Sequence, residues 1–316
     1  MSLPIKIGIS ACLLGEKVCR DGGHARDLHA AEELAKHVEF VPLCPELACG
    51  MGIPREEVRQ VDCAGDIRLI GRDSGEDWTQ RMDRWCQKVL PDLESEHLDG
   101  FILKSDSNSC GLHRATIHST TGKPARRGTG YFTRKLVEHF PLLPAETASR
   151  FTNPISRENF IRRVFVLNRW TDMLNKGIRI GNLVDFHTRH KLIIRAHDLK
   201  GYRQLCRLLG ESSMFNVNEI FDTYATLLFQ SLKLKATPRK NADVLMHAIS
   251  YLKQEIDKGD KQELTAQVNA YKAGKIPLLI PVTLINHYAR KHDKQYLLQQ
   301  LFFNPDSTEL KLLNHI

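Results

Sequence analysis

The first half of the chain alternates short apolar runs with longer amphipathic segments. Three runs rich in β-branched and aromatic residues, 5–10, 39–43 and 100–104, are typical of buried strands. Residues 27–37 are rich in Ala, Leu, Glu and Lys, and residues 77–90 place apolar side chains three and four positions apart. Both segments therefore predict helices. Strand, helix, strand, helix, strand predicts a parallel sheet covered by helices.

From Ser156 onward the pattern is helical throughout. Ser156 is the expected N-cap of a helix at 157–176, which Gly177 ends. The further expected helices are 181–197, 199–209, 215–234, 240–258, 260–273, 278–290 and 293–302. We therefore predict an α/β N-terminal domain with a Rossmann-like parallel sheet, residues 1–147, followed by an all-α C-terminal domain, residues 148–316.

Two shorter segments complete the pattern of the first half. Residues 68–70 predict a short edge or hairpin strand. Residues 126–130, Arg-Arg-Gly-Thr-Gly, predict a flexible turn.

Charge and cysteine divide the chain in opposite ways. The 316 residues carry a net charge of +8, but residues 1–150 hold 20 Lys and Arg against 22 Asp and Glu. Residues 151–316 hold 25 against 15, whereas seven of the eight cysteines lie in the first 110 residues. The N-terminal half is therefore near-neutral and thiol-bearing, and the C-terminal half is basic.

The apolar runs of the chain are short. The first ten residues lack the apolar core of a signal peptide, and the longest mainly apolar run, 276–285, is about half of the ~20 residues of a membrane span. We expect a cytoplasmic protein without membrane attachment, in which thiols stay reduced. The cysteines are then better explained as buried, catalytic or metal-binding than as disulfides.

Three cysteines each follow one of the three clearest strands. Cys12, Cys44 and Cys110 stand in the loops after those strands, and such loops gather at one edge of a parallel sheet. Converging thiolates suit an iron–sulfur cluster or zinc. A buried cysteine can also act simply as a small hydrophobic side chain. No Cys-x-x-Cys pair decides between these interpretations. The purely hydrophobic one is assigned to Cys63, Cys86 and Cys206.

Short motifs throughout the chain carry a family resemblance. In the first half they are SACLLG at 10–15, CRDG at 19–22, CPE at 44–46 and KSDSNSCG at 104–111. In the second half they are RENF at 157–160, FHTRHK at 186–191, AH at 196–197 and PLLIP at 277–281. Together they resemble the thiouracil desulfurase family, in the two-domain form that resembles bacterial desulfidases acting on 4-thiouridine in transfer RNA.

This resemblance implies a cofactor and a reaction. A 4Fe-4S cluster would be held by Cys12, Cys44 and Cys110, which leaves one iron open to a substrate sulfur. The implied reaction is a non-redox hydrolysis that turns a thiocarbonyl of thiolated uridine into a carbonyl.

The chain departs from the family pattern in three places, and these departures leave the ligand set open. Asn108 replaces the usual proline, no aromatic residue follows Arg20, and Cys49 stands where the family often has glycine. Cys19, which lies in a family motif, and Cys49 therefore remain further candidates near the cluster.

Three polar residues near these cysteines are candidates for catalysis. Glu46 is the expected acid/base, Ser107 would orient water or the leaving sulfur, and Lys104 would steady developing charge. The alternatives are a carboxylate at a helix N-terminus for Glu46, a loop-capping hydroxyl for Ser107 and a solvated strand end for Lys104.

The basic half predicts an RNA partner. Residues 157–207 hold 12 Lys and Arg against 4 Asp and Glu, interleaved with Trp170 and Tyr202. The candidate RNA-binding residues are Arg157, Arg162, Arg163, Arg169, Arg189, Lys191 and Arg195. A solvated helical face with ion pairs is the alternative. His187, His190 and His197 are expected to be structural or RNA-facing, not metal ligands. Thiolated tRNA is the predicted partner, and no protein partner is implied.

Three other functions compete with the tRNA desulfidase. A nucleic-acid-binding redox sensor would tolerate four cysteine ligands and need no carboxylate beside its cluster. A desulfurase acting on free 2-thiouracil would need no basic half. A structural zinc site would use the same thiols.

Overall fold

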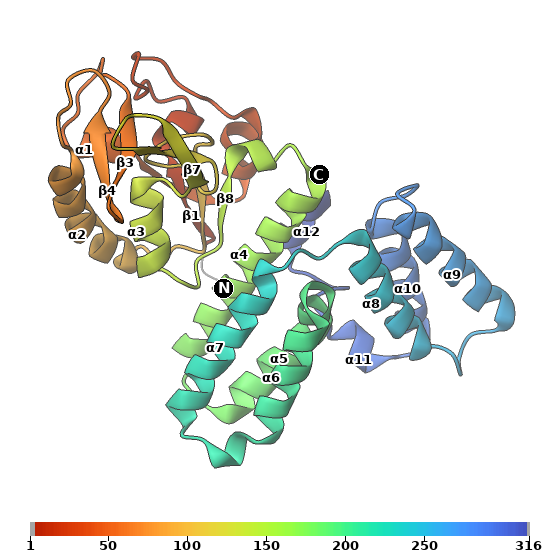
Figure 1. Ribbon diagram of the computed structural model, residues 1–316. Helices are drawn as coiled ribbons and strands as arrows, with labels where there is room; N and C mark the ends of the chain where they lie inside the picture. The colour runs from red at the N-terminus through yellow and green to blue at the C-terminus, as the bar shows by residue number, and fades with distance from the viewer. Residues whose placement is uncertain (1–3, 315–316) are drawn as a thin grey trace. The chain divides into compact units, whose positions relative to one another are not determined.

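The computed structural model describes residues 4–314. The chain divides into two compact units, Met1–Asn168 (unit 1) and Arg169–Ile316 (unit 2). The division falls inside the long helix α4 (Pro154–Asn175). Unit 1 contains all the strands of the described residues, and unit 2 is helical (Figure 1).

The central sheet of unit 1 is parallel, with strand order β2-β1-β5-β8. Its strands are β1 (Lys6–Ser10), β2 (Glu39–Leu43), β5 (Gly100–Leu103) and β8 (Ala145–Thr147). β2 is an edge strand, which tolerates Pro42 because a proline nitrogen donates no ladder hydrogen bond. The α/β class predicted from the alternating pattern is confirmed, and the three expected strands are neighbours.

The core of unit 1 is centred on β5. All four of its residues are buried, as expected for a central parallel strand covered on both faces. A Cβ at Gly8 of β1 would lie 2.3 Å from the Phe101 ring, so only glycine lets the two strands pack this closely. On α3 (Tyr131–His139), Phe132 packs against Phe101 with ring centroids 6.1 Å apart. This packing fixes the carboxyl ends of the strands.

A second, mixed sheet has the order β4-β3-β6-β7. Its strands are β3 (Val58–Cys63), β4 (Asp66–Gly71), β6 (Ala115–Ser119) and β7 (Pro124–Gly128). Residues 68–70 lie in β4 and form the expected hairpin with β3. The flexible turn predicted at 126–130 is wrong, because 126–128 belong to β7. This edge strand is polar and solvent-facing, so it lacks the apolar alternation that marks a strand.

The helices of unit 1 cover these sheets. α1 (Pro45–Ala48) is a single turn, and α2 (Thr79–Ser95) buries one apolar stripe, as the spacing at 77–90 predicts. The helix predicted at 27–37 differs: it consists of a π-helical turn, His29–Glu33, and a 3₁₀ turn, Leu34–Lys36.

The first long helix begins earlier than predicted. α4 starts at Pro154, and the Asn153 side chain accepts a hydrogen bond from the Ser156 N–H at 3.0 Å. Asn153 therefore caps this helix instead of Ser156.

Unit 2 is all-α, as predicted. Its helices are α5 (Ile180–His197), α6 (Leu199–Gly210), α7 (Val217–Lys233), α8 (Pro238–Ser250), α9 (Lys258–Lys272), α10 (Leu279–Lys291), α11 (Gln295–Leu298) and α12 (Ser307–Asn314). The helix expected at 240–258 ends at Ser250, since Asp257 caps the next one. The helix expected at 293–302 is shorter in the structure, where only α11 is helical. Beyond α11, the Leu301 N–H donates to the Arg189 carbonyl. Among residues 4–314, no helix is long and apolar enough to cross a membrane.

Candidate active site

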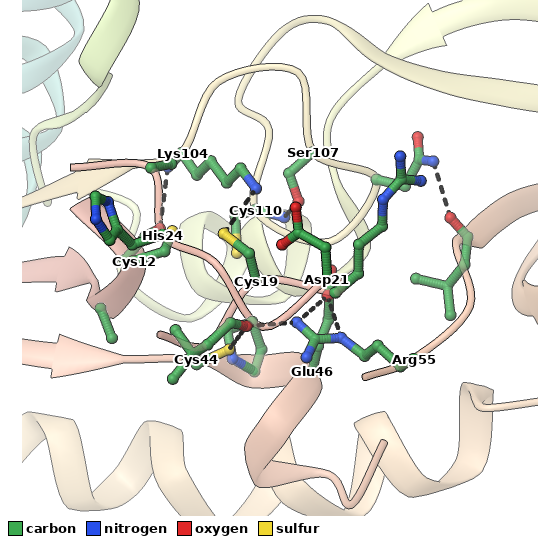
Figure 2. A pocket seen from close by; sticks show the side chains of 18 of the residues that line it. Cys12, Cys19, Asp21, His24, Cys44, Glu46, Arg55, Lys104, Ser107 and Cys110 are labelled. Carbon is green, nitrogen blue, oxygen red and sulfur yellow. Dashed lines mark hydrogen bonds and ion pairs between the residues drawn. The ribbon is translucent and has the colours of Figure 1, made fainter. Parts of the chain in front are cut away.

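Cys12, Cys44 and Cys110 line one pocket of about 450 Å³ at the carboxyl ends of β1, β2 and β5 (Figure 2). These three strands are neighbours in the parallel sheet, so their following loops meet at one edge, as the strand pattern predicts. All residues that line the pocket lie between positions 10 and 110, within unit 1. Residues 98 positions apart in the sequence are thus brought to one place.

Backbone hydrogen bonds hold the first two cysteines. Cys12 lies in a 3₁₀ turn directly after β1, and its carbonyl accepts from Gly15 N–H at 3.3 Å and Ala25 N–H at 3.0 Å. Cys44 is the residue before α1, and its thiol donates to the Val18 carbonyl at 3.9 Å. The loop after β1 therefore supports both sulfur-bearing residues.

The loop after β5 holds Cys110. The Ser107 hydroxyl accepts from the Cys110 N–H at 3.0 Å, and the Cys110 carbonyl accepts from the Thr133 hydroxyl at 2.8 Å. A Cβ at Gly111 would lie 2.5 Å from the Ser107 carbonyl oxygen, so the loop closes this tightly only with glycine. Ser107 thus has the loop-capping role that was its alternative, while its O–H remains able to donate toward the pocket.

Burial opposes ionisation of the three thiols. Burial raises the pKa of Cys12 to about 12, and it also raises the pKa values of Cys44 and Cys110. Thiolate ligands must lose their protons, so metal binding here would release them.

The chemistry of the cysteine donors, three thiols that line one pocket, is that of an iron–sulfur ligand set. In the described part of the chain, no three His, Cys, Asp or Glu side chains are close enough to hold a single metal ion. A lone zinc site is therefore not preformed. An all-sulfur donor set around one pocket fits an iron–sulfur cluster.

Glu46 is anchored in the pocket wall by Arg55. The Arg55 Nε and Nη2 groups donate to Glu46 Oε2 at 2.9 and 2.7 Å, and the Arg55 side chain is only 6% exposed. Arg55 also donates to the Val18 carbonyl at 2.8 Å. Both contacts from Arg55 fall on Oε2, so Oε1 is not held by Arg55. Paired N–H contacts of this kind fix a carboxylate in one orientation.

Lys104 brings a positive charge to the thiols. Its backbone N–H donates to Ser10 Oγ at 3.0 Å, which joins the ends of β5 and β1, and its Nζ lies 3.6 Å from Cys19 Sγ. Burial disfavours the charged ammonium, but Cys12, Cys19 and Glu46 outweigh this effect and raise the pKa of Lys104. Lys104 is therefore a fixed cation inside the pocket and not a solvated strand end.

The two additional cysteine candidates separate. Cys19 lines the pocket with the three strand-end cysteines, whereas Cys49 does not. The thiol of Cys49 instead donates to the Glu46 carbonyl at 3.3 Å. Of the cysteines assigned as hydrophobic, Cys86 is buried, and Cys63 and Cys206 are half-buried.

Sequence reasoning did not single out several polar residues of the pocket, among them Asp21, His24 and Arg55. Asp21 and His24 line it from the loop after β1, and Arg55 holds Glu46. Asp21 belongs to the CRDG motif, which could have directed attention to it. Arg55 had no comparable signal, because only the tertiary structure brings it to Glu46.

Two of the proposed RNA-binding arginines lie in the interior. Arg162 is buried, and its Nε donates to Glu158 at 3.1 Å. Arg169 is 12% exposed and pairs with Asp306 at 2.8 Å and with the fully buried Glu309. The guanidinium groups of these two residues form internal ion pairs, so the structure favours a structural role for them over RNA binding.

Replacing Arg169 with methionine is expected to lower the free energy of unfolding by about 3–5 kcal/mol. Glu309 would keep its buried charge without this guanidinium, and breaking a buried pair on one side carries a cost of this size. Urea denaturation measures it, with the exposed Arg189→Met as the matched control, expected to change the value by less than ~0.5 kcal/mol. Wild-type stability combined with weakened RNA binding would instead return Arg169 to the surface role.

The other proposed RNA-binding residues are accessible to different degrees. Arg189 is exposed, Arg163, Lys191 and Arg195 are half-buried, and the half-buried Arg157 donates to the Phe151 carbonyl at 3.1 Å. Of the two interleaved aromatics, Trp170 is buried and packs on Phe186 and Tyr224, so it cannot stack on a base. Tyr202 is half-buried at the surface.

The three histidines of α5 are structural. His187, His190 and His197 are all buried, and their Nδ1 atoms contact the Tyr224 hydroxyl, the Phe186 carbonyl and the Leu234 carbonyl. Burial lowers the pKa of His187 to about 4 and of His190 to about 3, so both are neutral at physiological pH.

Comparisons with known proteins support the division into two parts. Residues 7–148 match a family described as 2-thiouracil desulfurase, and residues 191–307 match a protein family of unknown function, DUF1722. The chain is 31% identical over 142 residues to the uncharacterized protein YbgA of Escherichia coli (strain K12), which covers 45% of this chain and 84% of YbgA. It is 33% identical over 111 residues to the uncharacterized protein YbbK of Bacillus subtilis (strain 168), covering 33% of this chain and 71% of YbbK.

One solved structure is also similar. The [4Fe-4S]-dependent thiouracil desulfidase TudS is 27% identical, covers 47% of this chain and 93% of its own, and aligns with a TM-score of 0.37. The residues matched by the 2-thiouracil desulfurase family model, 7–148, include every residue that lines the cysteine-bearing pocket of unit 1. The chain therefore belongs to the 2-thiouracil desulfurase family, extended by a helical C-terminal domain of the DUF1722 type.

Proposed function

We propose that this protein is a tRNA 4-thiouridine desulfidase, in which water replaces the sulfur of the thiocarbonyl and sulfide leaves. The carbon ends as a carbonyl and no electrons are exchanged. The observation that carries this proposal is the single pocket lined by Cys12, Cys44, Cys110 and the anchored Glu46. A redox sensor would need no such carboxylate beside its thiols.

The three thiols would hold the cofactor. A 4Fe-4S cluster bound to Cys12, Cys44 and Cys110 supplies one iron without a cysteine ligand, which serves as a Lewis acid that attracts sulfur. All other steps belong to the side chains of the pocket.

Glu46 would act as the base. Its Oε1 accepts a proton from the attacking water while Arg55 holds Oε2. The Lys104 ammonium stabilises negative charge as the thiocarbonyl is attacked, and the Ser107 O–H orients the water or the leaving sulfur. The proton held by Glu46 then passes to the leaving sulfide, so that both protons of the water depart with the sulfur.

A direct assay tests this function. Anaerobically reconstituted protein is incubated with thiolated tRNA, and loss of the near-ultraviolet 4-thiouridine absorbance is measured. We expect this absorbance to disappear, with slower turnover of free 2-thiouracil. Equal or faster turnover of free 2-thiouracil would support the alternative, a desulfurase that acts on the free base. One observation favours that alternative: the whole pocket lies in unit 1. Absence of turnover on both, with an intact cluster, would contradict an enzyme.

Binding to tRNA is expected to fall steeply as salt rises. Residues 151–316 carry 25 Lys and Arg against 15 Asp and Glu, and Arg189, Arg203 and Arg207 are exposed on α5 and α6. Four phosphate contacts predict a loss of about 10²-fold in affinity between 50 and 200 mM salt. Fluorescence anisotropy with labelled, unmodified tRNA measures this slope. A salt-independent affinity would exclude the basic half as a phosphate-binding surface.

A further inference from the structure

The tyrosines of unit 2 fall into two groups. Three of its six are core residues whose hydroxyls have fixed internal partners. These are Tyr224 with His187, Tyr271 with Asn241 and Tyr288 with Asp260. The other three, Tyr202, Tyr251 and Tyr296, remain at the surface. The second group also has ring contacts, Tyr202 with His187 and Tyr251 with His247, but part of each ring in this group stays accessible to solvent.

The surface tyrosines come from three separate elements, and two of them, Tyr251 and Tyr296, are in ring contact. Tyr202 lies in the first turn of α6, Tyr251 directly follows α8, and Tyr296 lies in α11. The ring centroids of Tyr251 and Tyr296 are 4.7 Å apart with an interplanar angle of 33°. Tyr202 interacts electrostatically with Tyr251. Tyr251 is 43% exposed, so one aromatic surface of the pair is open to solvent.

One arginine interacts with these tyrosines, and two more lie on the helix that carries Tyr202. Arg195, in the last turn of α5, is half-buried and interacts electrostatically with Tyr202 and Tyr296. α6 also presents exposed Arg203 and Arg207 one turn apart. Glu255, four residues after Tyr251, forms an ion pair with Lys294 at 2.5 Å, so its negative charge is neutralised.

Aromatic rings beside a guanidinium are the surface that unpaired nucleic-acid bases select. Every base has a π face, so stacking on tyrosine and arginine is tolerant of sequence, while neighbouring arginines contact the phosphates. Paired bases inside a helix cannot offer that face. We propose that Tyr202, Tyr251, Tyr296 and Arg195 form a tyrosine platform on which unpaired bases of the RNA substrate stack. This proposal rests on the proposed RNA-binding function of the helical half.

Competition and substitution together test the platform. The affinity of the full-length protein for labelled, unmodified tRNA is measured at several salt concentrations for wild type, Tyr251→Ala and Tyr251→Phe. We expect Tyr251→Ala to weaken binding about tenfold with an unchanged salt slope, because stacking releases no counterions. Tyr251→Phe keeps the ring and should bind within about twofold of wild type. Arg203→Ala is the ionic comparison, expected to reduce the salt slope by about one phosphate contact.

The competitor separates stacking from charge. Single-stranded oligouridylate should displace the tRNA at lower concentration than a fully paired RNA duplex of equal phosphate content, and Tyr251→Ala should remove this difference. Wild-type affinity of Tyr251→Ala, with its thermal stability unchanged, would overturn the platform while leaving the RNA substrate in place. If wild-type protein binds no tRNA but turns over free 2-thiouracil, the proposed RNA function itself fails.

Discussion

Glu46→Gln is expected to reduce desulfuration by about 10²–10⁴-fold, the usual contribution of a general base. The amide keeps the shape of the side chain and an oxygen for Arg55, but it cannot accept the proton of the attacking water. The initial rate of 4-thiouridine loss, normalised to the iron content of each preparation, measures the effect.

A second carboxylate of the pocket provides the control for Glu46. Glu57 also lines the pocket, but it forms ion pairs with Arg72 at 3.1 Å and Arg20 at 3.6 Å. Glu57→Gln should cost at most a few-fold. If Glu46→Gln retains wild-type turnover with an intact cluster, Glu46 is a structural anchor of its loop and the base lies elsewhere.

Replacing any one of Cys12, Cys44 and Cys110 with serine is expected to abolish both cluster retention and activity. Each would supply a thiolate that serine cannot replace, and the three stand at the ends of three adjacent strands. Iron and sulfide content and visible absorbance after anaerobic reconstitution measure the loss independently of turnover.

Two further cysteines sharpen this experiment. Cys63→Ser, on β3 and outside the pocket, should keep full iron content. Cys19→Ser decides the number of ligands, since Cys19 lines the pocket and lies 3.6 Å from Lys104 Nζ. Retained iron in Cys19→Ser supports three thiolate ligands and an open iron. Loss of the cluster would indicate four cysteine ligands and favour the redox-sensor alternative.

Arg55 links the chemistry to the support of the pocket. It holds Glu46 and at the same time donates to the Val18 carbonyl, which also accepts from the Cys44 thiol. One buried cation thus ties the candidate base to the loops that carry the cysteines. A carboxylate fixed in this way needs little reorganisation when it takes a proton, which is the benefit of a preorganised site.

The sequence predicts the roles of individual residues better in unit 1 than in unit 2. In unit 1 the strand-end cysteines could be identified because strand periodicity and parallel topology together dictate which loops meet. In unit 2 the composition indicates a phosphate partner, but arginines with the same sequence character take opposite roles. Arg169 is 12% exposed and pairs with Glu309, whereas Arg189 is exposed.

Local pattern by itself determined the α/β class, the helical second half, the strand-end positions of Cys12, Cys44 and Cys110, and the separation of thiols from positive charge. These features depend on periodicity and composition, which are properties of neighbouring residues. Only the tertiary structure decided the partnership of Glu46 with Arg55 and the ring contact of Tyr251 with Tyr296. Such contacts join residues from separate elements, and they form only once packing has set where each element lies.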